Sequence, residues 1–204
     1  MGRKLGRWLS QFLTICAVFM MVFGVSSAAT TNVIPGPDPI TVNYPGTSIA
    51  AAVGDILISS NTRSSGLVGH AAIVDSNLNV QQMLGSPNKL SNGTQSISAF
   101  FADNNNQVKV MRFNDPAKAL DAGRKAIDLV NWYGSDTYSL WDRLDSLSPT
   151  MYCTKFVWDC YYFGTGGASG GVNLRNLWTG STAVSPYELA LDSRLSKIYQ
   201  SSNY

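Results

Sequence analysis

The sequence predicts an α+β fold in which a small antiparallel sheet packs against helices. Two observations lead to this prediction. Short apolar runs bounded by turn residues occupy the first half of the chain, and segments with helical spacing follow in the second half. Strands and helices do not alternate regularly, as they would in a parallel α/β fold.

The strand candidates are short runs rich in β-branched and aliphatic residues. The second and third are joined by the polar pair Ser76-Asn77, which predicts a hairpin. Residues 85–94 are rich in Gly, Ser and Asn and are expected to form a loop. The four predicted strands cover residues 55–58, 69–75, 79–84 and 107–113.

The first predicted helix begins at Asp115-Pro116, which supplies an N-cap and a proline at the first helical position. Gly134 is its expected end. A second helix is expected to begin near Pro149 or Tyr152 and to end at Gly164, followed by a loop over 164–182 and a short helix at 186–189. The first helix should bury Ala119, Gly123, Ala126, Ile127 and Val130, and the second Cys153, Phe156, Val157, Cys160 and Tyr161.

The 204-residue chain has the 45% hydrophobic and 14% charged composition of a globular protein. Its formal charge is +2, and Arg3, Lys4 and Arg7 supply part of that excess. The rest of the chain is therefore close to neutral. This argues against a nucleic-acid partner, because phosphate binding needs clustered positive charge.

The N-terminus predicts a secretory signal. The basic residues precede an apolar stretch over 12–25, and small residues follow at 26–29. We expect a signal peptide over 1–29 cleaved after Ala28 or Ala29, an extended Pro-rich lead-in over 30–48 and one domain over 49–204. The mature protein would then be secreted or associated with the cell wall; an uncleaved anchor is the alternative.

Cleavage would leave two cysteines, Cys153 and Cys160. Seven residues apart in a helix, their Cα atoms would lie about 10 Å apart, whereas a disulfide needs less than about 7 Å. Both are therefore predicted to be free thiols. His70 is the one histidine of the chain, and there is no Cys-x-x-Cys pair. On these grounds we expect no metal and no cofactor.

Cys153 would lie in the first turn of its helix, where free N–H groups and the helix dipole favour a thiolate. The alternative is a small buried apolar residue, which suits Cys160. His70 is the available base, although a lone histidine on a strand is often structural. Gln81 or Gln82 on the next strand would flank the imidazole and orient it, unless both are ordinary strand residues.

Three motifs in order resemble a known family. They are Gly54-Asp55-Ile56-Leu57, the segment from Gly69 through His70 to Val74, and the segment from Tyr152 through Cys153 to Val157. Together they resemble the circularly permuted papain-like amidases (the YaeF/YiiX group) of the NlpC-type superfamily of papain-like cysteine peptidases. The resemblance covers about residues 52–195, including the segment 186–189. A histidine that precedes the cysteine is the mark of the permutation.

The resemblance implies that Cys153 is the nucleophile and His70 its base. Gln82 takes the third polar position, where glutamate is commoner. Tyr138 and Tyr152 are assigned to the oxyanion or substrate-binding part of the site. Lys155 stands where glutamate is commoner, and we expect it to change substrate preference.

The expected function is a secreted cysteine hydrolase that cleaves an amide bond, in cell-wall peptides, through an acyl-enzyme. Two alternatives stay open: a hydrolase or acyltransferase acting on lipid amides, esters or thioesters, and a non-catalytic cell-wall binding module. The expected partners are a small peptide, a peptidoglycan fragment or a lipid-like amide, with no nucleic acid and no metal. The oligomeric state is left open.

Overall fold

The computed structural model describes residues 41–61, 69–86, 89–133, 137–146 and 150–204. The expected signal peptide, its cleavage site and most of the expected lead-in lie outside the described residues and stay predictions. Residues 41–48 of the lead-in pack on the domain, with Tyr44 fully buried and its hydroxyl donating to Asp55 at 2.6 Å. Among the described residues, no helix is long and apolar enough to cross a membrane.

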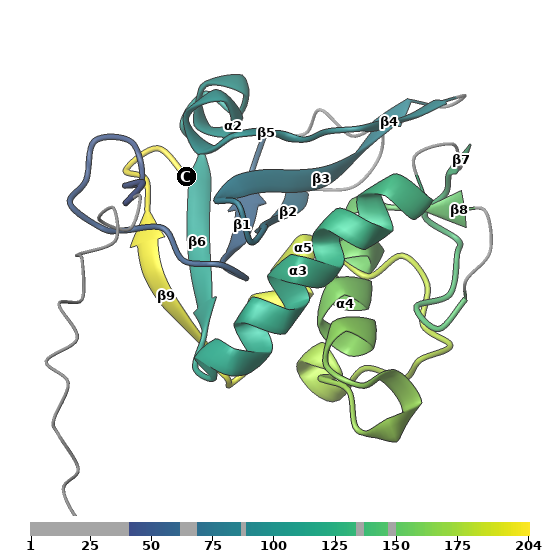
Figure 1. The fold of residues 1–204 in the computed structure, drawn as a ribbon. Coiled ribbons are helices and arrows are strands. Elements are labelled where there is room, and N and C mark those ends of the chain that lie inside the picture. Colours follow the sequence, from purple (N-terminus) through teal and green to yellow (C-terminus); the bar gives the residue numbers. More distant parts are fainter. Residues whose placement is uncertain (1–40, 62–68, 87–88, 134–136, 147–149) are drawn as a thin grey trace, which may run out of the picture. The chain divides into compact units, whose positions relative to one another are not determined.

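An antiparallel sheet organises the domain (Figure 1), with strand order β4-β3-β2-β1-β6-β9 and β5 paired with β3. A separate parallel pair, β7 with β8, lies beside it. The strands are β1 (Ile56–Ser59), β2 (His70–Val74), β3 (Asn79–Ser86), β4 (Lys89–Asn92), β5 (Gln95–Ser96), β6 (Val108–Phe113), β7 (Thr137–Tyr138), β8 (Thr150–Met151) and β9 (Leu195–Gln200).

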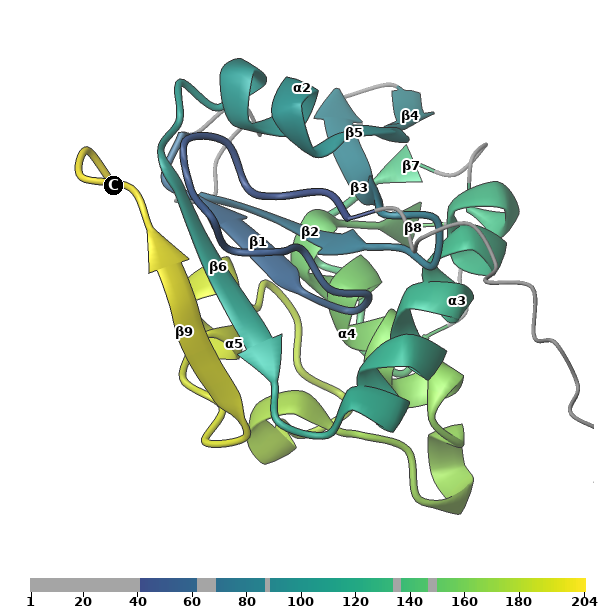
Figure 2. The same ribbon diagram turned by 60° about the vertical axis from the view of Figure 1, so that its left-hand side comes forward.

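Helices cover both faces of this sheet. α3 (Pro116–Trp132) and α4 (Cys153–Gly164) lie on one face and α2 (Ile97–Asp103) on the other (Figures 1 and 2). The central strand β1 is therefore buried on both sides: Ile56 and Ile58 pack with α3 and α4, and Leu57 packs with α2. The α+β prediction is confirmed.

Local capping chemistry fixes two of the helix starts as predicted. The Asp115 side chain accepts hydrogen bonds from the N–H groups of Ala117 and Lys118, and Pro116 opens α3. At α5 (Pro186–Leu189), Ser185 and Glu188 form a reciprocal capping box.

The structure departs from the expected elements in several places. β3 runs on to Ser86 and pairs with β4, so the expected loop at 85–94 contains a strand. On α3, Ile127 is only half-buried, whereas Ala122 and Leu129 are buried. All residues of α4 from Cys153 to Tyr161 are buried rather than one face, because α3, the sheet and the chain after α4 surround it. α2 and β9 were not expected from the sequence.

Candidate active site

Cys153 is the first residue of α4, with Tyr152 as the N-cap. The first N–H groups of a helix have no partner within the helix, and their partial positive charge favours an anion beside them. The helix packs against β2 and β3, so its N-terminus delivers the thiol to the sheet. The side chain is fully buried.

The thiol meets the sheet where β2 and β3 separate. Their ladder ends at Ala72 opposite Gln82. The N–H of Asp75 donates to β3, so by alternation the N–H groups of Ile73 and Ala71 face the same way. Ala71 lies beyond the end of the ladder, and its N–H donates to the Cys153 sulfur instead.

His70 is the first residue of β2 and is 3% exposed. Its Nε2 lies 2.7 Å from Oε1 of Gln82. An amide oxygen only accepts, so Nε2 carries the proton and Nδ1 is the nitrogen left for the thiol. Gln81 points elsewhere: it donates to Asp75 and accepts from Thr94, each at 2.7 Å. Of the two expected orienting amides, the structure brings Gln82 to the imidazole.

The imidazole and the thiol act on each other's protonation. Burial by itself would raise the pKa of Cys153, but the hydrogen-bonding and charge interaction with His70 lowers it to about 7, with help from the Ala71 N–H and Tyr138. Burial by itself would lower the pKa of His70, but the interactions with Cys153 and then Gln82 raise it above its usual value. The pair therefore favours a thiolate beside an imidazolium.

The two groups lie close enough to shift each other's pKa, but the structure aligns no hydrogen bond between them. Nδ1 of His70 has no hydrogen-bond partner of normal geometry among the described residues. Catalytic hydrogen bonds are often long or poorly aligned without substrate and tighten in the reacting complex. The ring also lies beside Phe100 of α2, with 6.2 Å between ring centroids. Sequence reasoning missed both Phe100 and the Ala71 N–H, because each depends on how distant segments pack.

The two tyrosines expected at the site lie in different places. Tyr138, on β7, has its hydroxyl 3.7 Å from the Cys153 sulfur and donates toward it. Tyr152 is fully buried, and its hydroxyl accepts from the N–H of Val184 at 3.3 Å. The structure therefore brings Tyr138 to the thiol and encloses the Tyr152 side chain in the core.

Lys155, which was expected to change substrate preference, has a fully buried side chain. Its Nζ donates to the carbonyls of Leu144 and Ser146 at 3.2 and 2.6 Å and to Asp159 at 2.9 Å. These partners make it a structural cation within the core, with the Asp142 carboxylate also 3.9 Å away.

Cys160 is fully buried two turns along α4. Burial raises its pKa well above the usual range, so it stays a neutral thiol. Both cysteines are free, as predicted. The same helix therefore holds one activated and one inert thiol.

A cavity of about 200 Å³ adjoins the imidazole and its orienting amide. Its lining includes His70, Gln82, Leu84 and Gln95, so it lies between β3, β5 and the end of α2. It gives a small molecule a place beside the imidazole.

No protein-family model matches the chain. An uncharacterised 30.3 kDa protein of Bacillus thuringiensis is 33% identical over 125 residues, which is 55% of this chain and 44% of that protein. The chain thus aligns with less than half of that relative's length. The crystal structure of the metalloprotein YiiX from Escherichia coli O157:H7 is similar in fold, with a TM-score of 0.50 and 16% identity. The match covers 74% of this chain and 97% of that one.

The description of YiiX as a metalloprotein contradicts the expectation that this protein takes no metal, since YiiX has a similar fold. The composition argument covered only multi-histidine and Cys-x-x-Cys sites, and other donor sets exist. The residues described in this structure bring no three or more His, Cys, Asp or Glu side chains together as a ligand group.

The names of the matched proteins likewise lend no support to the expected peptide, peptidoglycan or lipid-like substrates. At this level of identity, the comparisons show an α+β fold of the YiiX kind.

Proposed function

We propose that this protein is a cysteine hydrolase of the permuted papain-like type, with Cys153 as nucleophile and His70 as base. One observation carries the proposal: a thiol at a helix N-terminus contacts an imidazole whose far nitrogen is held at 2.7 Å by Gln82. The base therefore lies between the nucleophile and the orienting group, which is the spatial arrangement that covalent acyl transfer uses. In chain order the histidine precedes the cysteine, as in the permuted group.

The reaction would begin with transfer of the Cys153 proton to Nδ1 of His70. The thiolate attacks the carbonyl carbon of an amide, and the imidazolium gives its proton to the leaving nitrogen. A thioester to Cys153 remains. Water, deprotonated by His70, then attacks this thioester, releases the carboxylic acid and restores the thiol.

Negative charge on the carbonyl oxygen needs donors beside the nucleophile. The backbone N–H of Cys153, at the first helical position, is one candidate. The Tyr138 hydroxyl, 3.7 Å from the sulfur, is the other. Gln82 keeps the proton on Nε2 throughout, so that Nδ1 stays available for proton transfer. The same thiolate would also cleave esters, which makes an activated ester a usable probe.

A burst assay with p-nitrophenyl acetate tests the proposal. The wild type should release about one equivalent of nitrophenolate quickly, because acylation of Cys153 precedes the slower hydrolysis. Mass spectrometry should find the acetyl group on Cys153. Cys160→Ala, the matched control in the same helix, should keep the burst.

Cys153→Ala should lose both the burst and the adduct. If the burst survives in Cys153→Ala, or if the acetyl group is found on Cys160, Cys153 is not the nucleophile and the proposal fails.

A further inference from the structure

The β3–β4 hairpin touches both groups that assist the Cys153–His70 pair. Gln82, which orients the imidazole, belongs to β3 itself. Further along β3, Gly85 lies against Tyr138, whose hydroxyl faces the thiol. After β4 the chain returns to Gln82, where the N–H of Gly93 donates to the Gln82 carbonyl at 3.2 Å.

At Gly85 the Tyr138 ring occupies the space that a side chain would take. A Cβ built on Gly85 would lie 2.8 Å from Cδ1, Cδ2 and Cε2 of that ring. Equal approach to atoms on both sides of the ring means that the ring lies face-on to the glycine. The ring is rigid, so any displacement of it would carry the hydroxyl away from its place 3.7 Å from the Cys153 sulfur.

At Gly93 the Gln82 side chain occupies the corresponding space. A Cβ on Gly93 would lie 2.6 Å from Cγ of Gln82 and 3.0 Å from its Nε2. Carbon atoms in contact normally lie about 3.5–4.0 Å apart, so the side chain would have to move. Its Oε1 would then leave the 2.7 Å contact with His70.

We propose that Gly85 and Gly93 are positioning residues of the active site, whose missing side chains set Tyr138 against the thiol and Gln82 against the imidazole. The inference rests on the proposed function, in which those two groups assist the reacting pair. Each glycine contacts one side of the pair only, and because the thiol and imidazole are coupled, double-mutant cycles assign each effect to its partner.

Two readouts follow the two sides without any substrate. The rate of alkylation by iodoacetamide against pH reports the thiol, and the NMR titration of His70, the one histidine of the chain, reports the imidazole. Gly85→Ala should slow alkylation roughly tenfold, a modest loss for a misplaced group, and should reach the His70 titration only through the coupled thiol. Gly93→Ala should move the His70 titration to lower pH, because the hydrogen bond from His70 Nε2–H to Gln82, which supports the imidazolium, is disturbed.

Double-mutant cycles separate positioning from general damage. In a Tyr138→Ala background, where the ring is absent, Gly85→Ala should add no further effect. In a Gln82→Ala background, Gly93→Ala should add none. Gly46→Ala is the control, because it strains a turn with φ of +71° but places its methyl in open space; it should move neither readout.

Gly85→Ala as a single substitution can prevent folding. In that case we expect the Gly85→Ala/Tyr138→Ala double variant to fold, because the clashing ring is absent. Failure of the double variant to fold overturns the proposal. The proposal is also overturned if a glycine substitution has the same effect in the wild type as in the variant that lacks its partner side chain. The glycine would then act through other contacts. Neither readout requires hydrolysis. A negative burst assay with positive cycles would therefore count against the hydrolase alone.

Discussion

The imidazole of His70 is subject to two opposing influences. Its burial disfavours the charged ring, while the Cys153 sulfur and the Gln82 amide favour it. The second influence prevails in the described structure, so the pKa of His70 lies above its usual value. Removal of the sulfur should reverse that order.

We therefore predict that Cys153→Ser lowers the pKa of His70 below its usual value of about 6.5. The neutral serine supplies no negative charge, and burial remains. The NMR titration of this single histidine measures the shift directly, with Cys160→Ala as a control that leaves it unchanged. An unshifted titration in Cys153→Ser would show that thiol and imidazole do not interact as described.

At the residue scale, the residue pattern predicted the pair but left Gln81 or Gln82 open as its orienting group, and the family resemblance favoured Gln82. There was one histidine, and one cysteine at a helix start. The choice between Gln81 and Gln82 depended on strand register, because a slip of one residue turns every side chain to the other face. Ala72 lies opposite Gln82 and shares a face with His70, and this register puts Gln82 beside the imidazole.

At the scale of elements, α4 carries a buried ion pair one turn beyond the nucleophile. Burial, and then the neighbouring Asp142 carboxylate, raise the pKa of Asp159 to about 7, despite the opposite effect of Lys155. The unfolded carboxyl has a pKa of about 3.9. Between these two values the folded protein holds a proton that the unfolded chain releases, so the contribution of Asp159 to stability is lost as the pH rises from about 4 to about 7.

Asp159→Asn should remove that pH dependence. Between pH 5 and pH 8, the free energy of unfolding in urea should fall less for the variant than for the wild type, by at least about 1 kcal/mol. Asp128→Asn is the matched control, because it removes a carboxylate that is 71% exposed on α3. Parallel pH profiles for wild type and Asp159→Asn would contradict the raised pKa.

Elements with strong local signals were predictable, and elements that depend on their neighbours were not. Asp115-Pro116 starts a helix by its own capping chemistry. α2 has only seven residues, and β9 is an edge strand whose apolar and polar residues do not alternate and whose side chains are mostly exposed or partly exposed, so neither shows a clear apolar period. Lysine is usually a surface residue, so the burial of Lys155 was not predictable. The carbonyls that accept from it belong to Leu144 and Ser146, in the chain before α4.

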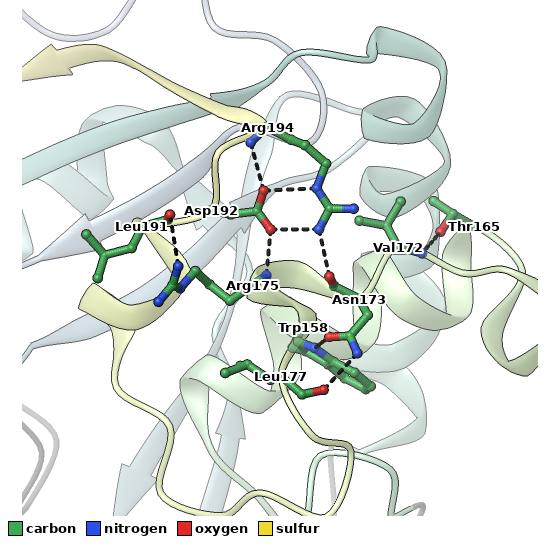
Figure 3. Close-up of polar contacts among 9 residues, drawn as sticks. All are labelled: Trp158, Thr165, Val172, Asn173, Arg175, Leu177, Leu191, Asp192 and Arg194. Atoms are coloured by element: carbon green, nitrogen blue, oxygen red, sulfur yellow. Dashed lines mark hydrogen bonds and ion pairs between the residues drawn. The ribbon is translucent and has the colours of Figure 1, made fainter.

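On the scale of the whole molecule, one acidic residue joins segments from distant parts of the fold (Figure 3). Asp192, between α5 and β9, accepts from the Arg175 N–H and from the Arg194 guanidinium. Arg194 also donates to the carbonyl of Asn173 at 2.6 Å, and the Asn173 side chain accepts from Trp158 of α4 at 3.1 Å. The chain after α4 is thereby tied to the last strand of the sheet.

Asp192→Asn should destabilise the protein by about 1–2 kcal/mol, because charge-assisted hydrogen bonds are lost from a buried acceptor. Urea unfolding measures the loss. Asp145→Asn, which breaks a surface pair with Arg143, should cost less than about 1 kcal/mol. Alkylation of Cys153 should be unchanged, because none of these contacts reaches the thiol.

The dependence of stability on pH in acid provides a second test of the role of Asp192. Burial would raise the pKa of this carboxyl, but the hydrogen bonds from Arg194 and from two backbone N–H groups lower it overall. Its contribution is thus present above about pH 4 and is lost as the pH falls further. The difference in the free energy of unfolding between wild type and Asp192→Asn should therefore become smaller below about pH 4. A difference that grows in acid would contradict the lowered pKa of Asp192.

The position of Ala71 at the end of the β2–β3 ladder has a consequence for when the thiol pKa is lowered during biosynthesis. Its N–H, His70 and Gln82 leave the ribosome well before the helix that carries Cys153. Until that helix docks at the opening between the two strands, the nascent chain carries an ordinary thiol that is mostly protonated near neutral pH. A chain in which this helix does not dock keeps the ordinary, weakly reactive thiol. The lowered pKa of Cys153 is therefore a property of the docked helix and not of the cysteine's place in the sequence.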